Sequence, residues 1–286
     1  MAISIKSFDT IYCISKYSGI IALIDGKGDV LNVVDLNTRM NRNEMYEYMP
    51  SKNQPFYQNG YLYFQITNSD LSNPNLSGDE LIEYQNDLIY KSPYLIRFKN
   101  VFDKNKCEYK KFLNAYYSGF LDKSTIAGEN PDFFISENKC YVASWYNDSI
   151  TVLDMVKNQK ISKRLYCKYS AIKSPGLNVK DMKTKELSWF LRESGMIDRI
   201  WVLKNKKIIL INYIHHTPDN KDASKYRKQS VAAYDMNLNK IFEVKIDLQN
   251  SYLTVEDNKM VINRLIKSEN DFLNIKFIKE YYEIKK

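Results

Sequence analysis

Residues 129–165 read ENPDFFISENKCYVASWYNDSITVLDMVKNQKISKRL, and this stretch decides the fold. It contains four runs of strand-like composition, in which aromatic and β-branched residues are frequent. Short polar turns separate the runs at Asn138-Lys139, Tyr146–Asp148 and Asp154–Gln159. Because connections this short join neighbouring antiparallel strands, the segment predicts a four-stranded meander.

The turn residues of this segment recur along the chain. An Asp ends the third strand of three units, in the runs IALID, ITVLD and VAAYD, at Asp25, Asp154 and Asp235. An Asn opens the first hairpin turn of four units, at Asn59, Asn138, Asn205 and Asn258. Repeated units of four short strands, separated by loops of variable length, are typical of propeller blades.

The repeats therefore predict an all-β fold, a β-propeller of four-stranded antiparallel blades in a single domain over residues 1–286. Five blades are visible in the sequence, and six is the expected number. Short helices are expected in the long loops, at Gly78–Tyr90 and Lys180–Glu193. A β-sandwich is the alternative fold, but it does not predict the same hairpin turns in unit after unit.

The sequence also predicts the strands at the N-terminus and at the C-terminus of the chain. The first blade lacks a clear inner or outer strand, and Ile3–Lys6 could close the ring by pairing with the last blade. The last blade is expected to end in two separate strands, Phe272–Ile278 and Tyr281–Ile284, because both runs are rich in aromatic and β-branched residues.

Composition places the chain among ordinary globular proteins. Hydrophobic residues make up 44% and charged residues 27%, which argues against disorder. The net charge of +8 arises from 42 basic and 34 acidic residues, interspersed as in residues 276–286. Mixed signs of this kind indicate a solvated surface, so nucleic acid is not an expected partner.

The four cysteines give no metal site. Cys13, Cys107, Cys140 and Cys167 contain no CxxC pair, so zinc is not expected, and neither is another cofactor. Cys13 and Cys140 lie in strand-like runs and are expected to be small core residues. Four cysteines allow three full pairings, and the sequence does not choose among them or a reduced state.

No apolar run reaches 18 residues, so no membrane-spanning helix is expected. The first residues, MAISIK, lack the hydrophobic region of a signal peptide. Met1 is therefore either the native start or the start that remains after an export signal is removed.

Two stretches resemble a known group of propellers. The run DTIYCISKYSGIIALIDGKGDVL at Asp9–Leu31 resembles the units of TolB-like six-bladed β-propellers, above all uncharacterised cell-envelope lipoproteins of that group. The run SWYNDSITVLD at Ser144–Asp154 is similar to another of their repeated units. The resemblance implies an exported, lipid-anchored protein of the cell envelope, periplasmic or surface-exposed. It carries over no catalytic residues.

A propeller separates its loops onto two faces. The turns between first and second and between third and fourth strands share one face, and here they are tight, as at Asn59-Gly60. The long segments belong to the other face, at residues 68–92, 114–130, 166–195 and 215–229. Because long loops on a rigid scaffold usually carry binding groups, the sequence predicts which face binds a ligand.

Six residues at or near this long-loop face are the candidate ligand-binding set: Trp145, Tyr146, Tyr213, His215, His216 and Arg227. Aromatic and Arg side chains can stack on a sugar or anchor a peptide, although Trp145 could instead pack between blades. Adjacent residues of an extended chain point in opposite directions, so His215 and His216 are not expected to share a metal. We expect both histidines in a surface loop.

No catalytic set is recognisable. The repeated turn position of Asp25, Asp154 and Asp235 predicts side chains that hydrogen-bond their own turns rather than a catalytic or calcium site. The run Gly26-Lys27-Gly28 lacks the frame of a phosphate-binding loop, and no GxSxG motif occurs.

The sequence therefore favours a non-catalytic binding module that recognises a protein, peptide or glycan through its long-loop face. The alternative is a propeller enzyme, a glycan hydrolase or lyase, that uses the central channel. We expect a monomer without a cofactor.

Overall fold

The computed structural model describes most of the strands and part of the loops. The described residues are 2–7, 10–15, 19–40, 46–48, 56–68, 75–78, 80, 84, 93–113, 125–126, 132–143, 148–169, 171–172, 177–178, 194–216, 228–246, 251–268 and 271–284. The chain divides into two compact units, Met1–Ile126 and Ala127–Lys286. The single domain over residues 1–286 stays a prediction.

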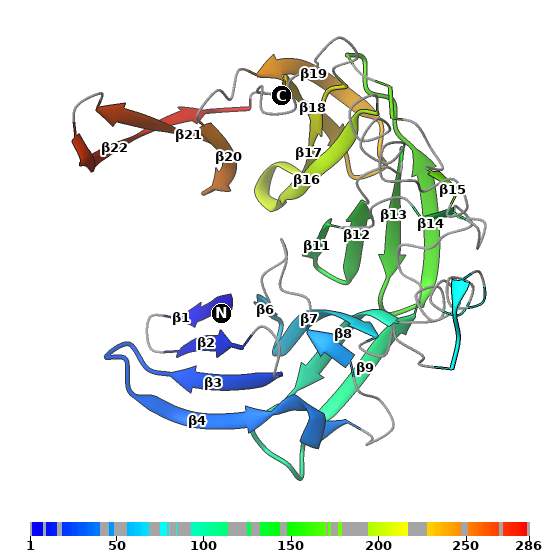
Figure 1. Cartoon of the computed structure of the whole chain (residues 1–286), viewed down its shortest axis with the longest axis vertical. Coiled ribbons are helices and arrows are strands. Elements are labelled where there is room, and N and C mark those ends of the chain that lie inside the picture. The colour runs from blue at the N-terminus through cyan, green and yellow to red at the C-terminus, as the bar shows by residue number, and fades with distance from the viewer. Residues whose placement is uncertain are drawn as a thin grey trace. The chain divides into compact units, whose positions relative to one another are not determined.

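The first unit contains two antiparallel sheets (Figure 1). The first sheet runs in the order β1 (Ala2–Ser7), β2 (Thr10–Ile14), β3 (Ile20–Ile24) and β4 (Val30–Asp35). The second runs in the order β5 (Tyr46–Tyr48), β7 (Tyr61–Asn68), β8 (Pro93–Lys99) and β9 (Glu108–Leu113), with β6 (Phe56–Gln58) paired to β7. The short strand β10 (Thr125–Ile126) and the 3-10 helix η1 (Leu36–Arg39) belong to the same unit.

The second unit contains three antiparallel sheets of three or four strands. The first is β11 (Asp132–Ser136), β12 (Lys139–Ala143), β13 (Ser149–Asp154) and β14 (Gln159–Arg164). The next is β16 (Met196–Leu203), β17 (Ile208–Ile214), β18 (Gln229–Asp235) and β19 (Lys240–Ile246). The last is β20 (Ser251–Glu256), β21 (Lys259–Ser268) and β22 (Asp271–Tyr282). The short strand β15 (Leu177–Asn178) and the 3-10 helix η3 (Lys204–Lys206) complete the unit.

The meander predicted within residues 129–165 is confirmed as β11–β14. Its register is continuous across the sheet, since Phe133 pairs with Val142, Val142 with Thr151, and Thr151 with Ser162. The hydroxyl oxygens of Thr151 and Ser162 lie 2.9 Å apart, a cross-strand polar pair of the kind that stabilises antiparallel sheets.

The inner strands β17 and β18 of the sheet β16–β19 are buried on both faces. Along β17, Ile209, Ile211 and Tyr213 pack in a core with side chains of β12 and β13, whereas Ile208 and Leu210 pack with side chains of β20 and β21. The alternation follows from the strand itself, because successive side chains point to opposite faces. A sheet packed on both faces by neighbouring sheets is the arrangement of a propeller blade, so the predicted all-β propeller architecture is confirmed.

The first unit is packed in the same way. Leu62, Phe64, Ile96 and Phe98 of the second sheet share a core with buried residues of the first sheet, namely Tyr12, Ile14, Ile21 and Val34. The described residues thus form five sheets with three or more strands. A sixth blade stays a prediction.

Two expectations about the terminal strands are wrong. The N-terminal strand β1 pairs with β2, with Ile3 opposite Cys13, because the short connection of residues 8–9 places it beside the next strand. It therefore supplies the fourth strand of the first sheet. The C-terminal run is one strand, β22, because β21 provides partners without a break for Ile275–Tyr282, with Asn263 opposite Lys279.

Of the expected helices, the one at Lys180–Glu193 lies outside the described residues. Within Gly78–Tyr90, three described residues are helical, Gly78, Glu80 and Tyr84.

The turn role predicted for Asp25, Asp154 and Asp235 is confirmed. In each turn the Oδ1 atom accepts two backbone N–H groups from the residues that follow, at 2.8–3.0 Å. The N–H group of Lys157 is the main cause that lowers the pKa of Asp154, and that of Asn239 lowers the pKa of Asp235. These carboxylates are therefore engaged with their own turns.

We expect Gly60→Ala to lower the free energy of unfolding by about 1 kcal/mol, measured in urea, because Gly60 has a φ of +82°. A Cβ atom there meets nothing within 4 Å, so the cost comes from the left-handed backbone and not from a clash. Gly60→Asn is the control and should lose less, since Asn tolerates this conformation, as Asn59 does at a φ of 52°. Equal losses for both variants would contradict this explanation.

Candidate functional site

A pocket of about 670 Å³ lies in the second unit, beside the chain segment that follows β14. This segment, of which residues 165–169, 171 and 172 are described, is called the β14 link. Residues 164–169, 171 and 172 line it, together with Asp148 and His216. Asp148 precedes β13, and His216 follows β17. The pocket is therefore built by two neighbouring sheets and the chain segment between them.

Antiparallel pairing brings these residues to one end of both sheets. Ser149, next to Asp148, pairs with Arg164. Ile214, two residues before His216, pairs with Gln229. The other end of the same sheets carries the tight turns of residues 155–158 and 236–239. The long segments predicted at residues 166–195 and 215–229 start at the pocket end. The pocket thus lies on the face that the sequence predicts to bind a ligand.

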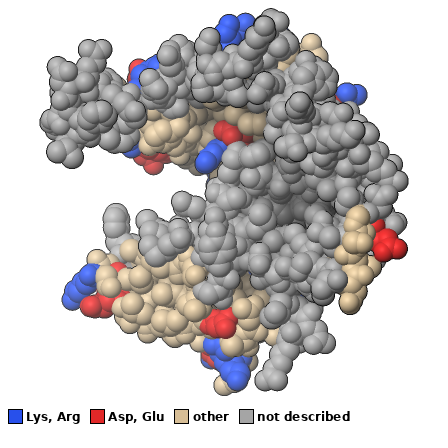
Figure 2. Space-filling view, in the orientation of Figure 1, with Lys and Arg blue, Asp and Glu red and all other residues tan. Residues whose placement is uncertain are grey.

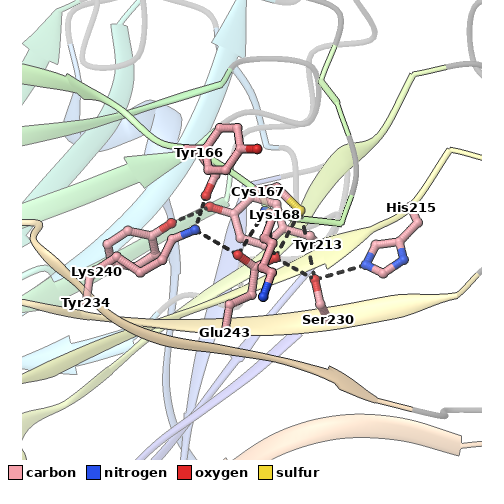
Figure 3. A network of polar contacts seen from close by, with 9 residues as sticks. All are labelled: Tyr166, Cys167, Lys168, Tyr213, His215, Ser230, Tyr234, Lys240 and Glu243. Carbon is pink, nitrogen blue, oxygen red and sulfur yellow. Dashed lines mark hydrogen bonds and ion pairs between the residues drawn. The ribbon is translucent and has the colours of Figure 1, made fainter.

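A buried carboxylate fixes the link beneath the pocket (Figure 3). Glu243 of β19 has a side chain only 2% exposed, and its two oxygens accept the backbone N–H of Lys168 at 3.1 and 2.9 Å. Its Oε1 atom also accepts hydrogen bonds from Cys167 Sγ at 3.2 Å and Ser230 Oγ at 3.3 Å. Its Oε2 atom lies 2.7 Å from Lys240 Nζ. Glu243 therefore ties the link to β18 and β19.

The ionised state of Glu243 determines which neighbouring groups donate hydrogen bonds and which accept them. Burial disfavours the charged form, but the hydrogen bonds from Lys240, Lys168 and Cys167 outweigh burial and hold the pKa of Glu243 below its ordinary value of 4.5. An ionised carboxylate only accepts, so the Ser230 hydroxyl donates to Glu243. His215 Nε2, 2.9 Å from Ser230 Oγ, must then carry a proton and donate to that oxygen.

The hydrogen-bonded order of His215, Ser230 and Glu243 differs from that of a catalytic triad. In a triad the histidine lies between the serine and the carboxylate and accepts the serine proton. Here Ser230 lies between His215 and Glu243, and its side chain is fully buried. The arrangement is suited to holding the link in place.

Lys240 fixes the backbone of Tyr166, one of the link residues that line the pocket. Its ammonium group donates to the backbone oxygen of Tyr166 and lies 5.2 Å from the centroid of the Tyr166 ring. The Tyr166 side chain nevertheless stays 73% exposed. Tyr166 therefore lines the pocket while its ring, beside the ammonium group, stays largely open to solvent.

Two buried tyrosines lie beneath this network. The hydroxyl oxygens of Tyr213 and Tyr234 are 3.0 Å apart. Burial raises the pKa of Tyr234 to about 12 and raises the pKa of Tyr213 well above its ordinary value. Both hydroxyls therefore stay neutral and belong to the core.

Cys167 lines the pocket but is not activated. Burial, and next the negative charge of Glu243, raise the pKa of its thiol to about 11. Because the thiolate is the reactive form, Cys167 is a poor nucleophile near neutral pH. All four cysteines are free thiols.

The charges at the pocket are mostly positive. Arg164 pairs with Asp148 on the lining, and its side chain is 82% exposed. Lys168 and Lys245 place their ammonium groups 5.6 and 4.7 Å from the centroid of the Tyr169 ring. Elsewhere, the face shown in Figure 2 carries described basic and acidic side chains next to one another within each unit.

A second pocket, of about 370 Å³, lies in the first unit beside Gly60 and the turn of residues 100–106. Tyr12 stacks on Tyr57 and Phe102, with ring centroids 5.7 and 6.1 Å apart. These rings are already packed against one another at the tight-turn end of the sheets. The pocket above the β14 link is therefore the stronger candidate.

The structure places only some of the six predicted site residues. Trp145, Tyr146 and Arg227 lie outside the described residues. Tyr213 is buried with 1% exposure, and His216 lines the pocket. The ligand-binding role of the set stays a prediction.

The surface-loop position expected for His215 is wrong. Its side chain is 5% exposed, because Ser230 and the ring of Tyr169, 5.9 Å away between centroids, cover it.

Sequence reasoning missed the residues that build the pocket, namely Arg164, Tyr166, Lys168, Tyr169, Lys240 and Glu243. The link residues read as irregular chain in the sequence, and Glu243 reads as one polar position of a strand. An available signal was the density of Tyr and Lys in the run LYCKYSAIK immediately after β14.

Comparison with solved structures supports the architecture. A member of the DUF4221 family from Bacteroides vulgatus is 11% identical, with a TM-score of 0.65 over 90% of this chain and 70% of that chain. The chain has a β-propeller fold. At this identity the similarity concerns the fold alone.

Two further solved structures are similar at lower scores. The β-propeller domain of the Trilobed protease from Pyrococcus furiosus is 12% identical, with a TM-score of 0.38 over 82% of this chain and 54% of that chain. An exo-1,5-α-L-arabinanase from a bovine ruminal metagenomic library is 10% identical, with a TM-score of 0.39 over 99% and 93%. Neither score supports a functional conclusion. No family model matches the sequence, and no curated protein matches it significantly.

The described residues show neither a metal-binding cluster nor a membrane-spanning helix. They contain no group of three or more His, Cys, Asp or Glu side chains arranged to hold a metal ion. Within the same part of the chain, no helix has both the length and the apolar character needed to cross a membrane.

Proposed function

We propose that this protein is a non-catalytic binding module and that the pocket above the β14 link is its ligand site. The proposal rests on one observation: the exposed ring of Tyr166 belongs to a link whose backbone is fixed by the hydrogen bonds of Glu243 and Lys240. Lys240 holds the backbone carbonyl of Tyr166, and Glu243 holds the backbone N–H of Lys168 two residues later. A binding group that is fixed before the ligand arrives loses less entropy on binding.

The chemistry of the lining favours binding over catalysis. The thiol of Cys167 stays protonated, since its pKa is about 11. Ser230 is buried and donates its proton to Glu243, and His215 donates to Ser230. These three groups stabilise the link and the strands next to the pocket. None of them presents an activated nucleophile or base to a ligand. No contact in the described residues specifically favours the alternative of a glycan hydrolase or lyase.

The size of the pocket suits a small ligand or a short segment of a larger one. Pockets of about 300–1,000 Å³ usually enclose most of a drug-sized molecule. Of the ligand classes that the sequence leaves open, a glycan or the side chains of a peptide fit such a volume. A broad protein surface would need a larger and flatter contact area.

We further propose that the protein works at the cell envelope, as the resemblance to TolB-like envelope lipoproteins implies. Fractionation of cells that produce the chain from its own gene, followed by immunodetection, tests this location. Recovery in the cytoplasmic fraction alone would exclude it without affecting the pocket.

Tyr166→Ala should weaken ligand binding about tenfold or more, because a stacking ring at the centre of a site commonly contributes over 1.4 kcal/mol. Glycan and peptide arrays identify a ligand for the unaltered chain, and calorimetry then compares the variants. Tyr252→Ala is the control, since Tyr252 is a 54% exposed tyrosine on β20 outside the pocket lining. Equal binding by both variants, each with an unchanged unfolding temperature, would overturn the proposed site.

A further inference from the structure

We infer that the pocket selects a sugar ring that bears an anionic group, a uronate or a sugar phosphate. The inference rests on the proposed binding function and adds the class of ligand. It is carried by three features of the lining: an unbalanced positive charge, a flat exposed ring and a limited volume.

The positive charge comes from two lysines on neighbouring elements. Lys168 of the link lines the pocket, whereas Lys245 of β19 lies beside the lining residue Tyr169. The two ammonium groups are 5.6 and 4.7 Å from the centroid of the Tyr169 ring. Two cations beside one ring repel each other, and an anion placed between them would relieve that repulsion. Among the described residues, no carboxylate forms an ion pair with either ammonium group.

The two acidic groups that the structure describes at the pocket already have partners. Asp148 is paired with Arg164, and Glu243 is paired with Lys240. Glu243 also accepts the backbone N–H of Lys168 and the thiol of Cys167, so it cannot turn toward the lysine side chains without losing these bonds. Among the described residues, Lys168 on the lining and Lys245 beside Tyr169 therefore remain as positive charges that no described carboxylate pairs with.

The aromatic lining indicates what carries the anionic group. Tyr166 lines the pocket with a side chain that is 73% exposed, and Tyr169 lines it beside the two ammonium groups. An exposed ring binds the flat apolar face of another ring, and a sugar presents such a face beside hydroxyl groups. A charge next to a stacking surface matches a sugar that bears a carboxylate or a phosphate.

The volume argues against the main competing ligand, an acidic peptide. At about 670 Å³ the pocket accommodates one or two sugar rings, whereas an extended peptide binds in a groove or along a strand edge. The lining residues cluster on a short link and do not follow an exposed strand. We therefore assign the site to a saccharide and treat peptide binding as an outcome of the test.

The test uses a panel of uronic acid oligosaccharides, their methyl esters and sugar phosphates, titrated into the full chain by calorimetry. The methyl ester removes the charge and keeps the ring. We expect an acidic saccharide to bind at least about tenfold more tightly than its ester, and binding to weaken as salt is added. The uronate and phosphate arms distinguish the two sources of the anionic group.

Lys168→Ala and Lys245→Ala should each weaken acidic saccharide binding about tenfold, the usual effect of losing a charge-assisted contact, with little change for the esters. Lys157→Ala is the matched control, because Lys157 is an exposed lysine in the turn at the opposite end of β13 and β14. An unchanged unfolding temperature for all three variants shows that the comparison concerns binding.

The outcomes separate this inference from the function on which it rests. Equal affinity for acids and esters, with loss of both in Tyr166→Ala, would overturn the charge selection and leave the binding site standing. Binding of an acidic peptide and of no saccharide would also overturn the inference alone. Failure of every saccharide and peptide to bind would overturn both.

Discussion

Glu243→Gln should lower the free energy of unfolding by about 2–3 kcal/mol at neutral pH, although it changes neither the shape nor the volume of the side chain. Both carboxylate oxygens face donors: Lys168, Cys167 and Ser230 at Oε1, and Lys168 and Lys240 at Oε2. An amide must turn its NH₂ group toward one of these sets, so donors meet donors in either orientation. Urea unfolding of the two proteins measures the difference.

The dependence on pH identifies the cause. The pKa of Glu243 is lower in the folded chain than its ordinary value of 4.5, so its contribution is fully present above that value and is lost as pH falls through the folded pKa. The gap in stability between the unaltered chain and Glu243→Gln should therefore be constant near neutrality and shrink in acid. A gap that persists unchanged in acid would show that shape and not charge is responsible.

A second carboxylate provides the control. Glu256 accepts Lys279 Nζ at 2.9 and 3.0 Å, but the side chains of this pair are 36% and 48% exposed. Exposed ion pairs contribute little, so Glu256→Gln should change the free energy of unfolding by less than about 1 kcal/mol. Similar losses in both variants would mean that burial of Glu243 does not determine its effect.

The sequence predicted well the strands whose ends are marked by turn residues a few positions away. The four strands of residues 129–165 are each bounded by a turn signal within a few positions, and Asp154 completes its hydrogen bonds with residues two and three positions later. Asp25 and Asp235 do so with residues two and four positions later. Side chains that bond within their own turn leave a pattern that can be read without knowing the fold.

The pocket depends on contacts that no local pattern records. Cys167 and Glu243 lie 76 residues apart in the chain, and Ser230 and Cys167 lie 63 apart. His215 follows a strand and precedes a polar stretch, which indicated a surface loop, but the packing of Tyr169 and Ser230 buries it. The face of the sheets could be predicted from loop lengths, whereas the side chains that line the pocket could not.

The terminal strands show a second limit. The sequence predicted two strands after Asp271, Phe272–Ile278 and Tyr281–Ile284, which leaves Lys279-Glu280 between them. In the structure Glu280 stays in the strand, because Arg264 on β21 contacts it at 2.6 Å. Cross-strand partners of this kind override the local preference of a charged residue for a turn.

Asp132→Ala should cost about 2–3 kcal/mol of the free energy of unfolding, because it removes the acceptor that bridges two sheets of the second unit. Asp132 on β11 is 5% exposed, and its Oδ2 atom accepts the backbone N–H of Ile200 on β16 at 2.8 Å. β16 is the edge strand of its sheet, so β17 satisfies only every other N–H group along it. Without Asp132, the N–H of Ile200 is left buried with no bond to that carboxylate.

Asp132→Asn separates the hydrogen bond from the charge, since the amide keeps one oxygen that can accept the Ile200 N–H. We expect this variant to lose about half as much stability as Asp132→Ala or less, as measured by urea unfolding. Amide exchange gives a second readout, because the Ile200 N–H should exchange faster in Asp132→Ala than in Asp132→Asn. If Ile200 exchanged equally slowly in both variants, another group would be its true acceptor, and Asp132 would not be the bridge between β11 and β16.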